Sequence, residues 1–286
     1  MSKKTLCVST VLAIFLLQPF MLRLSQSLQS ICESRFNNEI YGAWKAALIC
    51  GTSLGSAHLS QELKSLGLIH LIVVSGAHLV FLENALNLLL KPLPKRITRW
   101  SLPPILFLYS LFAGLQPPLV RALFSRLPIS PLFLRFLVSG VLSVLFFKEL
   151  SLSLTLSWAA SLLMSWPSTE KPHPASSAAF IFCGLFPLLL PMGAPSLWVA
   201  LLQPFYSLFF GALVFPISFL NLLLPLDGLT NLSWGFFFNL ISAAEQFDFQ
   251  THHQKLIHVP SALYLLALQL MYWRAEVQTR RAKCWN

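Results

Sequence analysis

Long apolar runs separated by short polar segments set the layout of this chain. A helix needs about 20 mainly apolar residues to cross the hydrocarbon core of a bilayer. Runs of that kind predict transmembrane helices over residues 5–22, 66–90, 101–120, 129–147, 150–166, 177–192, 197–224 and 257–273. The pattern therefore predicts an all-α fold, a polytopic transmembrane helical bundle with about eight spans.

Two further stretches are less regular. Residues 40–57 form a short run rich in small side chains, which is typical of a re-entrant or interfacial segment. Residues 233–250 place aromatic side chains beside Glu245 and Asp248, which indicates an amphipathic helix that lies at the membrane surface.

The composition agrees with a membrane location. Of the 286 residues, 56% are hydrophobic and 10% are charged. A soluble domain carries about 25% charged residues, so most of this chain is not expected to face water. With Lys3 and Lys4 on the cytoplasmic side, an even number of crossings returns the C-terminus to that side. Most of the net charge of +10 then lies on cytoplasmic segments, so it is poor support for nucleic acid binding.

This organisation divides the chain into three parts. We expect an N-terminal transmembrane helix with an external loop over residues 1–40 and a multi-span membrane domain over residues 41–273. A basic cytoplasmic tail follows over residues 274–286.

The cysteines show no C-x-x-C spacing and no regular framework; they are Cys7, Cys32, Cys50, Cys183 and Cys284. Three of them lie in or beside apolar runs, where a packed thiol is expected. Cys32 and Cys50 form a disulfide if their segment faces an oxidising compartment, and the sequence leaves this pairing open.

One apolar run carries polar side chains that a plain anchoring helix does not need. The stretch "GLIHLIVVSGAHLVFLE" spans residues 67–83 and contains His70, Ser75, His78 and Glu83. At 100° per residue His70 and His78 lie about 80° apart, and Ser75 lies about 60° beyond His78, so these three share one broad helix face. Gly76 permits a bend or a close helix contact beside them.

Three interpretations of this face remain open. It is a polar wall along a pore, or a site where Ser75 is a nucleophile and a histidine is its base, as in serine hydrolases. Alternatively, these side chains hydrogen-bond neighbouring helices and only hold the bundle together.

Three charged residues inside or at the edges of the predicted spans favour a polar path or a polar bundle interior. Glu83, Arg121 and Arg135 occupy such positions. An embedded charge costs roughly 2.5–3.5 kcal/mol on insertion scales, and such groups usually face the bundle interior or a water-filled path.

Some chemistry finds no support in the sequence. His70 and His78 lie eight positions apart rather than four, and no cysteine or carboxylate joins them on that face, so we expect no metal site. Without a glycine-rich phosphate loop, we also expect no bound nucleotide, no ATPase motor and no other cofactor.

Two motifs carry a resemblance to a known family. The first consists of Gly67, Leu68, His70, Leu71, Ser75, Gly76 and His78, and the second of Tyr109, Ala113, Gly114, Pro117, Arg121 and Ala122. Together they resemble the membrane competence domain of ComEC-type DNA-uptake proteins. The resemblance covers roughly residues 46–240 and is specific in its first third.

The resemblance implies a channel in the bacterial inner membrane that carries single-stranded DNA into the cytoplasm during natural transformation. His70, Ser75, His78 and Arg121 are the residues carried over, to the DNA pathway or its packing. The implied partners are single-stranded DNA, a separate cytoplasmic helicase or ATPase, external DNA-receptor proteins and membrane lipid. The oligomeric state stays open, a homo-oligomer included.

The resemblance is to the membrane domain alone, without the outer OB-like and the metallo-β-lactamase-like domains of the family. We therefore expect no enzyme activity in this chain. Two alternatives to the channel remain: an intramembrane hydrolase that uses Ser75 and His78, and a membrane scaffold that does not transport.

Overall fold

The computed structural model describes residues 3–52, 76–167, 174–189, 205–206, 209–245 and 261–285. These parts are helical and contain no strand, which confirms the all-α prediction. The helices are α1 (Lys3–Ser34), α2 (Gly42–Ile49), α5 (Gly76–Leu89), α6 (Lys95–Phe112), α7 (Pro117–Phe124), α8 (Leu132–Phe147), α9 (Leu152–Met164), α10 (Pro174–Leu189), the π-helix η2 (Phe210–Val214), α12 (Phe215–Leu223), α13 (Asp227–Glu245) and α14 (Ser261–Trp285).

The described helices follow the apolar runs but differ from them in extent, and α14 continues past the predicted end at residue 273 to Trp285. Helix α1 continues to Ser34, because neither glycine nor proline interrupts the chain after Pro19. The run predicted as one helix over residues 101–120 is instead broken after Phe112. Gly114 and Leu115 adopt positive φ angles there, and α7 restarts with proline in its first turn.

A helix must be both long and apolar to cross a membrane. Within the described ranges, no helix is both long enough and apolar enough to cross a membrane.

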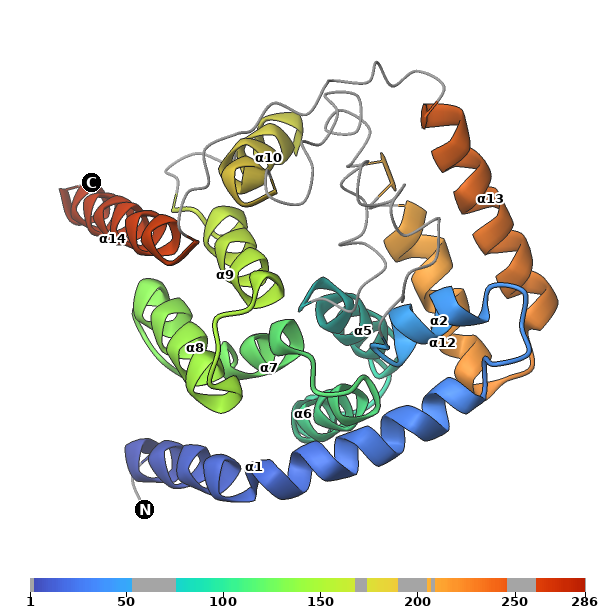
Figure 1. Ribbon diagram of the computed structural model, residues 1–286. Coiled ribbons are helices and arrows are strands. Elements are labelled where there is room, and N and C mark those ends of the chain that lie inside the picture. The colour runs from blue at the N-terminus through green and yellow to red at the C-terminus, as the bar shows by residue number, and fades with distance from the viewer. Residues whose placement is uncertain are drawn as a thin grey trace.

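Figure 1 shows the helices around a central group of α5 and α7. Helix α1 runs along one edge and packs against α6 and α2. One hydrophobic cluster joins the end of α1 and α2 to η2, α12 and α13, and another joins α8, α9, α10 and α14. A third, built from α5, α6 and α7, lies between them. The central helices are therefore held from both sides.

A disulfide closes the end of α1 onto the end of α2. Cys32 and Cys50, whose pairing the sequence left open, are bonded with their Cα atoms 5.7 Å apart. Disulfides persist in oxidising compartments, and the external location of this segment stays a prediction.

A buried ion pair lies in the same region. Lys45 on α2 has a fully buried side chain, and its ammonium contacts the carboxylate of Glu39. The ammonium also donates to Asn231 Oδ1 at 2.8 Å, and Asn221 Nδ2 donates to the carboxylate of Glu39 at 3.3 Å. Because Asn221 lies on α12 and Asn231 on α13, this pair ties both helices to α2.

Two charges at the edge of the pair extend this network. Arg35 reaches Glu39 and Asp227, each at 3.3 Å. A hydrogen bond from Asn221 and the charge of Arg35 lower the pKa of the exposed Asp227 carboxyl. Asp227 therefore stays ionised at the start of α13, where a negative charge is favourable.

Another carboxylate joins α14 to the start of α8. Glu276 on α14 accepts hydrogen bonds from the backbone N–H groups of Leu132 and Phe133, at 3.3 and 2.9 Å. These N–H groups belong to the first turn of α8, where a helix has no carbonyl oxygen of its own to accept their hydrogen bonds. Gln269 Nε2 adds a bond to the carbonyl oxygen of Phe133 at 2.8 Å.

This contact bears on the predicted topology. Eight crossings put the start of the 129–147 run and the segment after residue 273 on opposite sides of a membrane. The structure instead brings residues 132–133 and Glu276 together, so it does not support the prediction that the C-terminus returns to the side of the N-terminus. Glu276 also pairs with Arg280 one turn later on α14, so its carboxylate has both a charged partner and the donors of the helix start.

Removing the negative partner of the buried ion pair should be costly. We expect Glu39→Gln to lower the free energy of unfolding by about 3–5 kcal/mol, because it leaves the Lys45 charge buried and unpaired. The double change Glu39→Leu with Lys45→Met should recover most of that loss, since it removes both charges. Equilibrium unfolding in detergent micelles measures both effects.

Glu33→Gln is the matched control, because Glu33 is exposed and close by in sequence. It should change stability by less than about 0.5 kcal/mol. Equal effects of the two Glu→Gln changes would contradict a structural role for the buried pair.

Candidate functional site

The seven candidate residues are not all within the part of the chain that the structure describes. His70 and Ser75 lie outside the described residues. Gly76, His78, Glu83, Arg121 and Arg135 lie within them, on α5, α7 and α8.

The two sequence motifs meet where α5 approaches α7. A Cβ atom built on Gly76 would lie 3.5 Å from Arg121 Nη2, 3.4 Å from Ala122 Cβ and 3.5 Å from the carbonyl oxygen of Pro118. The start of α5 therefore lies beside the guanidinium, at distances that would put an added methyl group in ordinary contact with it. Residues that are far apart in sequence, in "SGAH" and in "PPLVRA", form one contact.

Arg121 is buried at this contact, with 4% of its surface exposed. Its Nε donates to Ser157 Oγ on α9 at 3.0 Å. Among the described residues, its Nη1 has no hydrogen-bond partner and no carboxylate forms an ion pair with it. The guanidinium is thus a buried positive charge held by a neutral serine.

His78 lies two residues further along α5, about half a turn around the helix from Gly76, and is also buried. Its ring stacks on Phe215, with ring centroids 4.9 Å apart and planes 18° from parallel, and Phe210 lies 6.1 Å away. Phe210 opens the π-helix η2, and Phe215 follows it directly. A π-turn inside a helix is often found at functional sites, and this one faces His78.

Tyr109 on α6 adds a second unpaired polar atom. Its hydroxyl is buried and has no hydrogen-bond partner in the part of the chain that the structure describes. Its ring packs edge-on against Phe219, with centroids 5.8 Å apart, and Phe219 in turn packs on Phe215. Tyr109 belongs to the second motif, but sequence reasoning did not select it as a site residue.

The two remaining candidates are occupied by structural contacts. Glu83 forms a two-pronged ion pair with Arg126, in which Arg126 Nη1 lies 2.6 Å from Glu83 Oε1. Arg135 Nε donates to the carbonyl oxygen of Ile129 at 3.0 Å. Within the described ranges, no hydrogen bond or ion pair joins Arg135 to Arg121. The structure therefore places Gly76 against Arg121 and His78 two residues further along α5, and it pairs Glu83 and Arg135 with other groups.

Sequence reasoning missed several of these features. The buried Lys45 was not singled out, because nothing in the nearby sequence marks a lysine as buried. The aromatic partners of His78 were missed because the chain has 24 phenylalanines, which gives no reason to single out Phe215.

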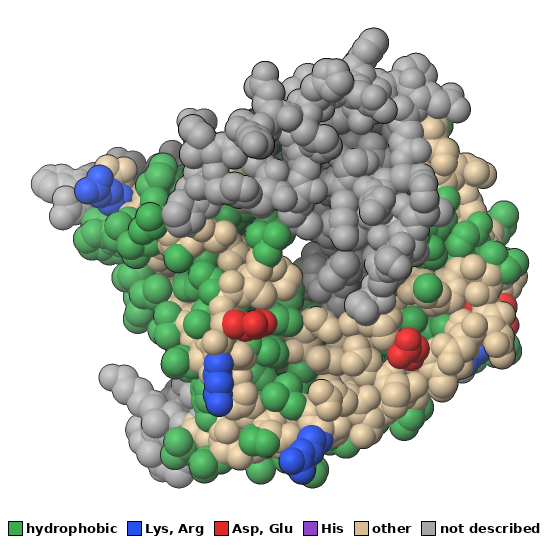
Figure 2. All heavy atoms as spheres, in the orientation of Figure 1, with side chains coloured by type: hydrophobic (Ala, Val, Ile, Leu, Met, Phe, Trp, Pro, Cys, Tyr) green, Lys and Arg blue, Asp and Glu red, His purple; other side chains and the backbone are tan. Residues whose placement is uncertain are grey.

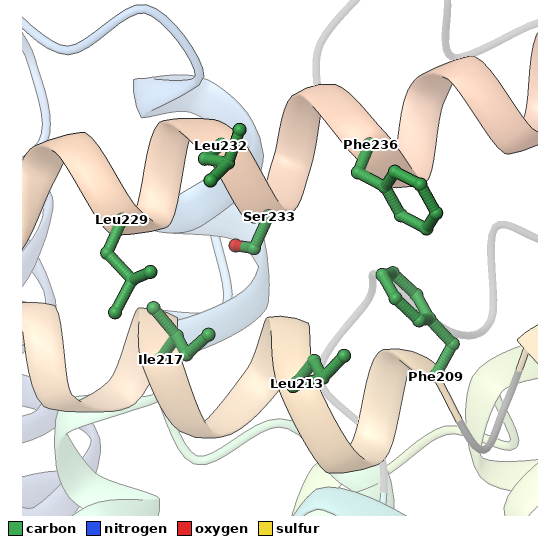
Figure 3. Close-up of a pocket in the computed structure, with 7 residues that line it drawn as sticks. All are labelled: Phe209, Leu213, Ile217, Leu229, Leu232, Ser233 and Phe236. Carbon is green, nitrogen blue, oxygen red and sulfur yellow. The ribbon is translucent and has the colours of Figure 1, made fainter.

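An apolar groove lies between α12 and α13, away from these residues (Figure 3). It has a volume of about 360 Å³ and is lined by Phe209, Leu213, Ile217, Leu229, Leu232, Ser233 and Phe236. Apart from one hydroxyl its lining is apolar. Such a lining offers no charge and no nucleophile pair for a reaction.

The arrangement around Arg121 can offer hydrogen bonds to an anion and flat rings to an aromatic group. Within the described ranges, no group of three or more His, Cys, Asp or Glu residues is placed to hold a metal ion. The nucleophile of the alternative hydrolase hypothesis, Ser75, is outside those ranges, so that hypothesis stays untested.

Comparison with known proteins gives one match. The family model described as Competence protein matches residues 48–164, a range that contains both motifs. No curated protein and no solved structure matches the chain. The family resemblance seen in the sequence is therefore confirmed over this range.

The serine that holds the guanidinium should matter more than its neighbours. We expect Ser157→Ala to lower the free energy of unfolding by about 1.5–3 kcal/mol, because it removes the hydrogen bond to a buried charge. Thermal and chemical unfolding in micelles measure this loss.

Ser161→Ala is the matched control, because Ser161 lies one turn later on α9 and its hydroxyl donates to the carbonyl oxygen of Ser157 in its own helix. We expect that change to cost less than about 0.5 kcal/mol. If both alanine variants were equally stable, the Arg121–Ser157 bond would not be holding the site.

Proposed function

We propose, from the competence-protein segment that this chain carries at residues 48–164, that the protein is a membrane channel subunit for DNA uptake. In this proposal it passes single-stranded DNA across the bacterial inner membrane during natural transformation. The chain is a passive conduit, and a separate cytoplasmic helicase or ATPase drives transport.

The surface supports a membrane location. Large apolar side chains on the outside of the helices are widely exposed, among them Leu16 at 74%, Trp100 at 73% and Leu232 at 70%. Figure 2 shows few charged side chains on the face that it presents. Exposed apolar surface on this scale needs an apolar surrounding, and lipid supplies one.

The interior supports a polar path. The observation that carries the proposal is the meeting of the two motifs, with Arg121 buried against Gly76 and with His78, two residues further along α5, stacked on Phe215. Proteins that hold single-stranded nucleic acid combine cations for the phosphates with aromatic rings for the bases. Both kinds of group lie together here.

Uptake of labelled DNA into a nuclease-protected cytoplasmic fraction tests this function. A clean deletion should abolish uptake, and the wild-type gene should restore it. The deletion complemented with Arg121→Ala at matched expression should stay at or near the deletion level, because that change removes the buried cation.

Arg23→Ala is the control for loss of an arginine, since Arg23 is exposed on α1. It should restore uptake as well as the wild type does. Unimpaired uptake in the deletion strain would refute the channel, and restoration by Arg121→Ala would remove the site from the pathway.

The membrane proposal also predicts that the start of α8 and the end of α14 lie on the same side of the membrane. Because Glu276 binds the first turn of α8, cysteines placed at Ser130 and Gln278 should react with a membrane-impermeant maleimide from the same side. A cysteine at Lys148, beyond the other end of α8, should react only from the opposite side.

The background for this labelling replaces Cys7, Cys183 and Cys284 by serine and keeps the disulfide, which does not react. Each single-cysteine protein is labelled in intact and in permeabilised cells. Labelling of Gln278→Cys together with Lys148→Cys would contradict the arrangement of α14 on α8, and would restore the topology expected from the basic residues.

A further inference from the structure

We infer that the guanidinium of Arg121 is an anion site that takes one phosphodiester group of the single-stranded DNA. This inference rests on the proposed function for its ligand. The site consists of Arg121 on α7, the start of the described part of α5 at Gly76, and Ser157 on α9.

The pairing of the arginines is the first argument. Arg35, Arg126 and Arg280 each pair with a carboxylate, while among the described residues no carboxylate reaches Arg121. Arg121 is nevertheless far more buried than those three. A buried charge without a counter-charge is strongly unfavourable, so an anion that joins Arg121 would be bound with a large gain.

The unused donors are the second argument. Nε is occupied by Ser157, and Nη1 is buried with no partner in the described part of the chain. Nη2 lies beside the bare backbone of Gly76. A guanidinium with its terminal nitrogens available presents the planar fork that matches two oxygens of a phosphate.

The neighbours favour a phosphate that is part of a nucleic acid. The buried ring pair of His78 and Phe215 lies two residues along α5 from Gly76, about half a turn around the helix, and would stack on a base that entered beside it. The hydroxyl of Tyr109, from a helix that also packs on α5, is a further donor without a partner among the described residues.

The test measures anion binding by the full chain in lipid nanodiscs. Inorganic phosphate is added at constant ionic strength, with chloride as the balancing anion, and the melting temperature is followed. A ligand that binds only the folded state raises that temperature in a concentration-dependent way. We expect phosphate to stabilise the wild type and Arg121→Lys to weaken the affinity by about 10- to 100-fold, since lysine has no fork.

Two further variants keep the result interpretable. Arg23→Lys changes an exposed arginine and should bind phosphate as the wild type does. Gly76→Ala adds a methyl group in ordinary contact distance, so it should fold normally, yet the methyl covers Nη2 and should weaken phosphate binding severalfold. It serves as the test even if Arg121→Lys does not fold.

The source of the phosphate is decided by three probes. A single-stranded oligonucleotide should compete with inorganic phosphate, and the same oligonucleotide with a neutral methylphosphonate backbone should not. Nanodiscs of phosphatidylglycerol and of phosphatidylcholine should give the same phosphate affinity. Loss of phosphate binding in phosphatidylglycerol alone would assign the site to a lipid headgroup and overturn the inference.

Absence of phosphate binding, or equal binding by wild type, Arg121→Lys and Gly76→Ala, would also overturn it. These failures differ from failure of the proposed function, which is judged by uptake in the deletion strain. A chain that is required for uptake but binds no phosphate keeps its function and loses this site.

Discussion

The buried ion pair of Lys45 and Glu39 is the constraint on which the arrangement of the N-terminal helices and α12–α13 depends. It gathers α2, the turn after α1, α12 and α13 around two opposite charges that water cannot reach easily. The disulfide between Cys32 and Cys50 closes the same region covalently. Because α12 is fixed here, Phe215 at its start is held against His78 on α5. The ion pair therefore positions an aromatic ring of the candidate site that it does not itself contact.

Charge pairing explains most of the polar groups that a hydrophobic chain retains. Glu83 is neutralised by Arg126, Arg35 bridges Glu39 and Asp227, and Glu276 binds the free N–H groups at the start of α8. Each of these joins segments that are distant in sequence or closes a helix end. Arg121 differs, since its described partner is the hydroxyl of Ser157, and it lies between the two motifs rather than at an outer edge. This contrast is the reason that we propose a functional role for Arg121 and a structural role for the paired charges.

The sequence predicted the helical class and the approximate positions of the helices, because apolar runs of about 20 residues have few other uses. Through the family motifs it selected Gly76 and Arg121, which the structure places in contact. The break between α6 and α7 was missed, since the positive φ at Leu115 is imposed by surrounding packing and not by residue type. The burial of Lys45 and the contact of Glu276 with α8 were missed because both depend on partners more than a hundred residues away. Local patterns do not report such pairs.

The most direct measurement of the central claim is site-specific photo-crosslinking to DNA during uptake. A photoreactive phenylalanine analogue replaces Phe215, which packs on His78, in cells taking up labelled single strands, and the same analogue replaces Phe20, which is 63% exposed on α1. The account predicts a protein–DNA adduct from position 215 that disappears when uptake is blocked, and none from position 20. Adducts from neither position, or equally from both, would contradict a DNA path along His78 and Arg121.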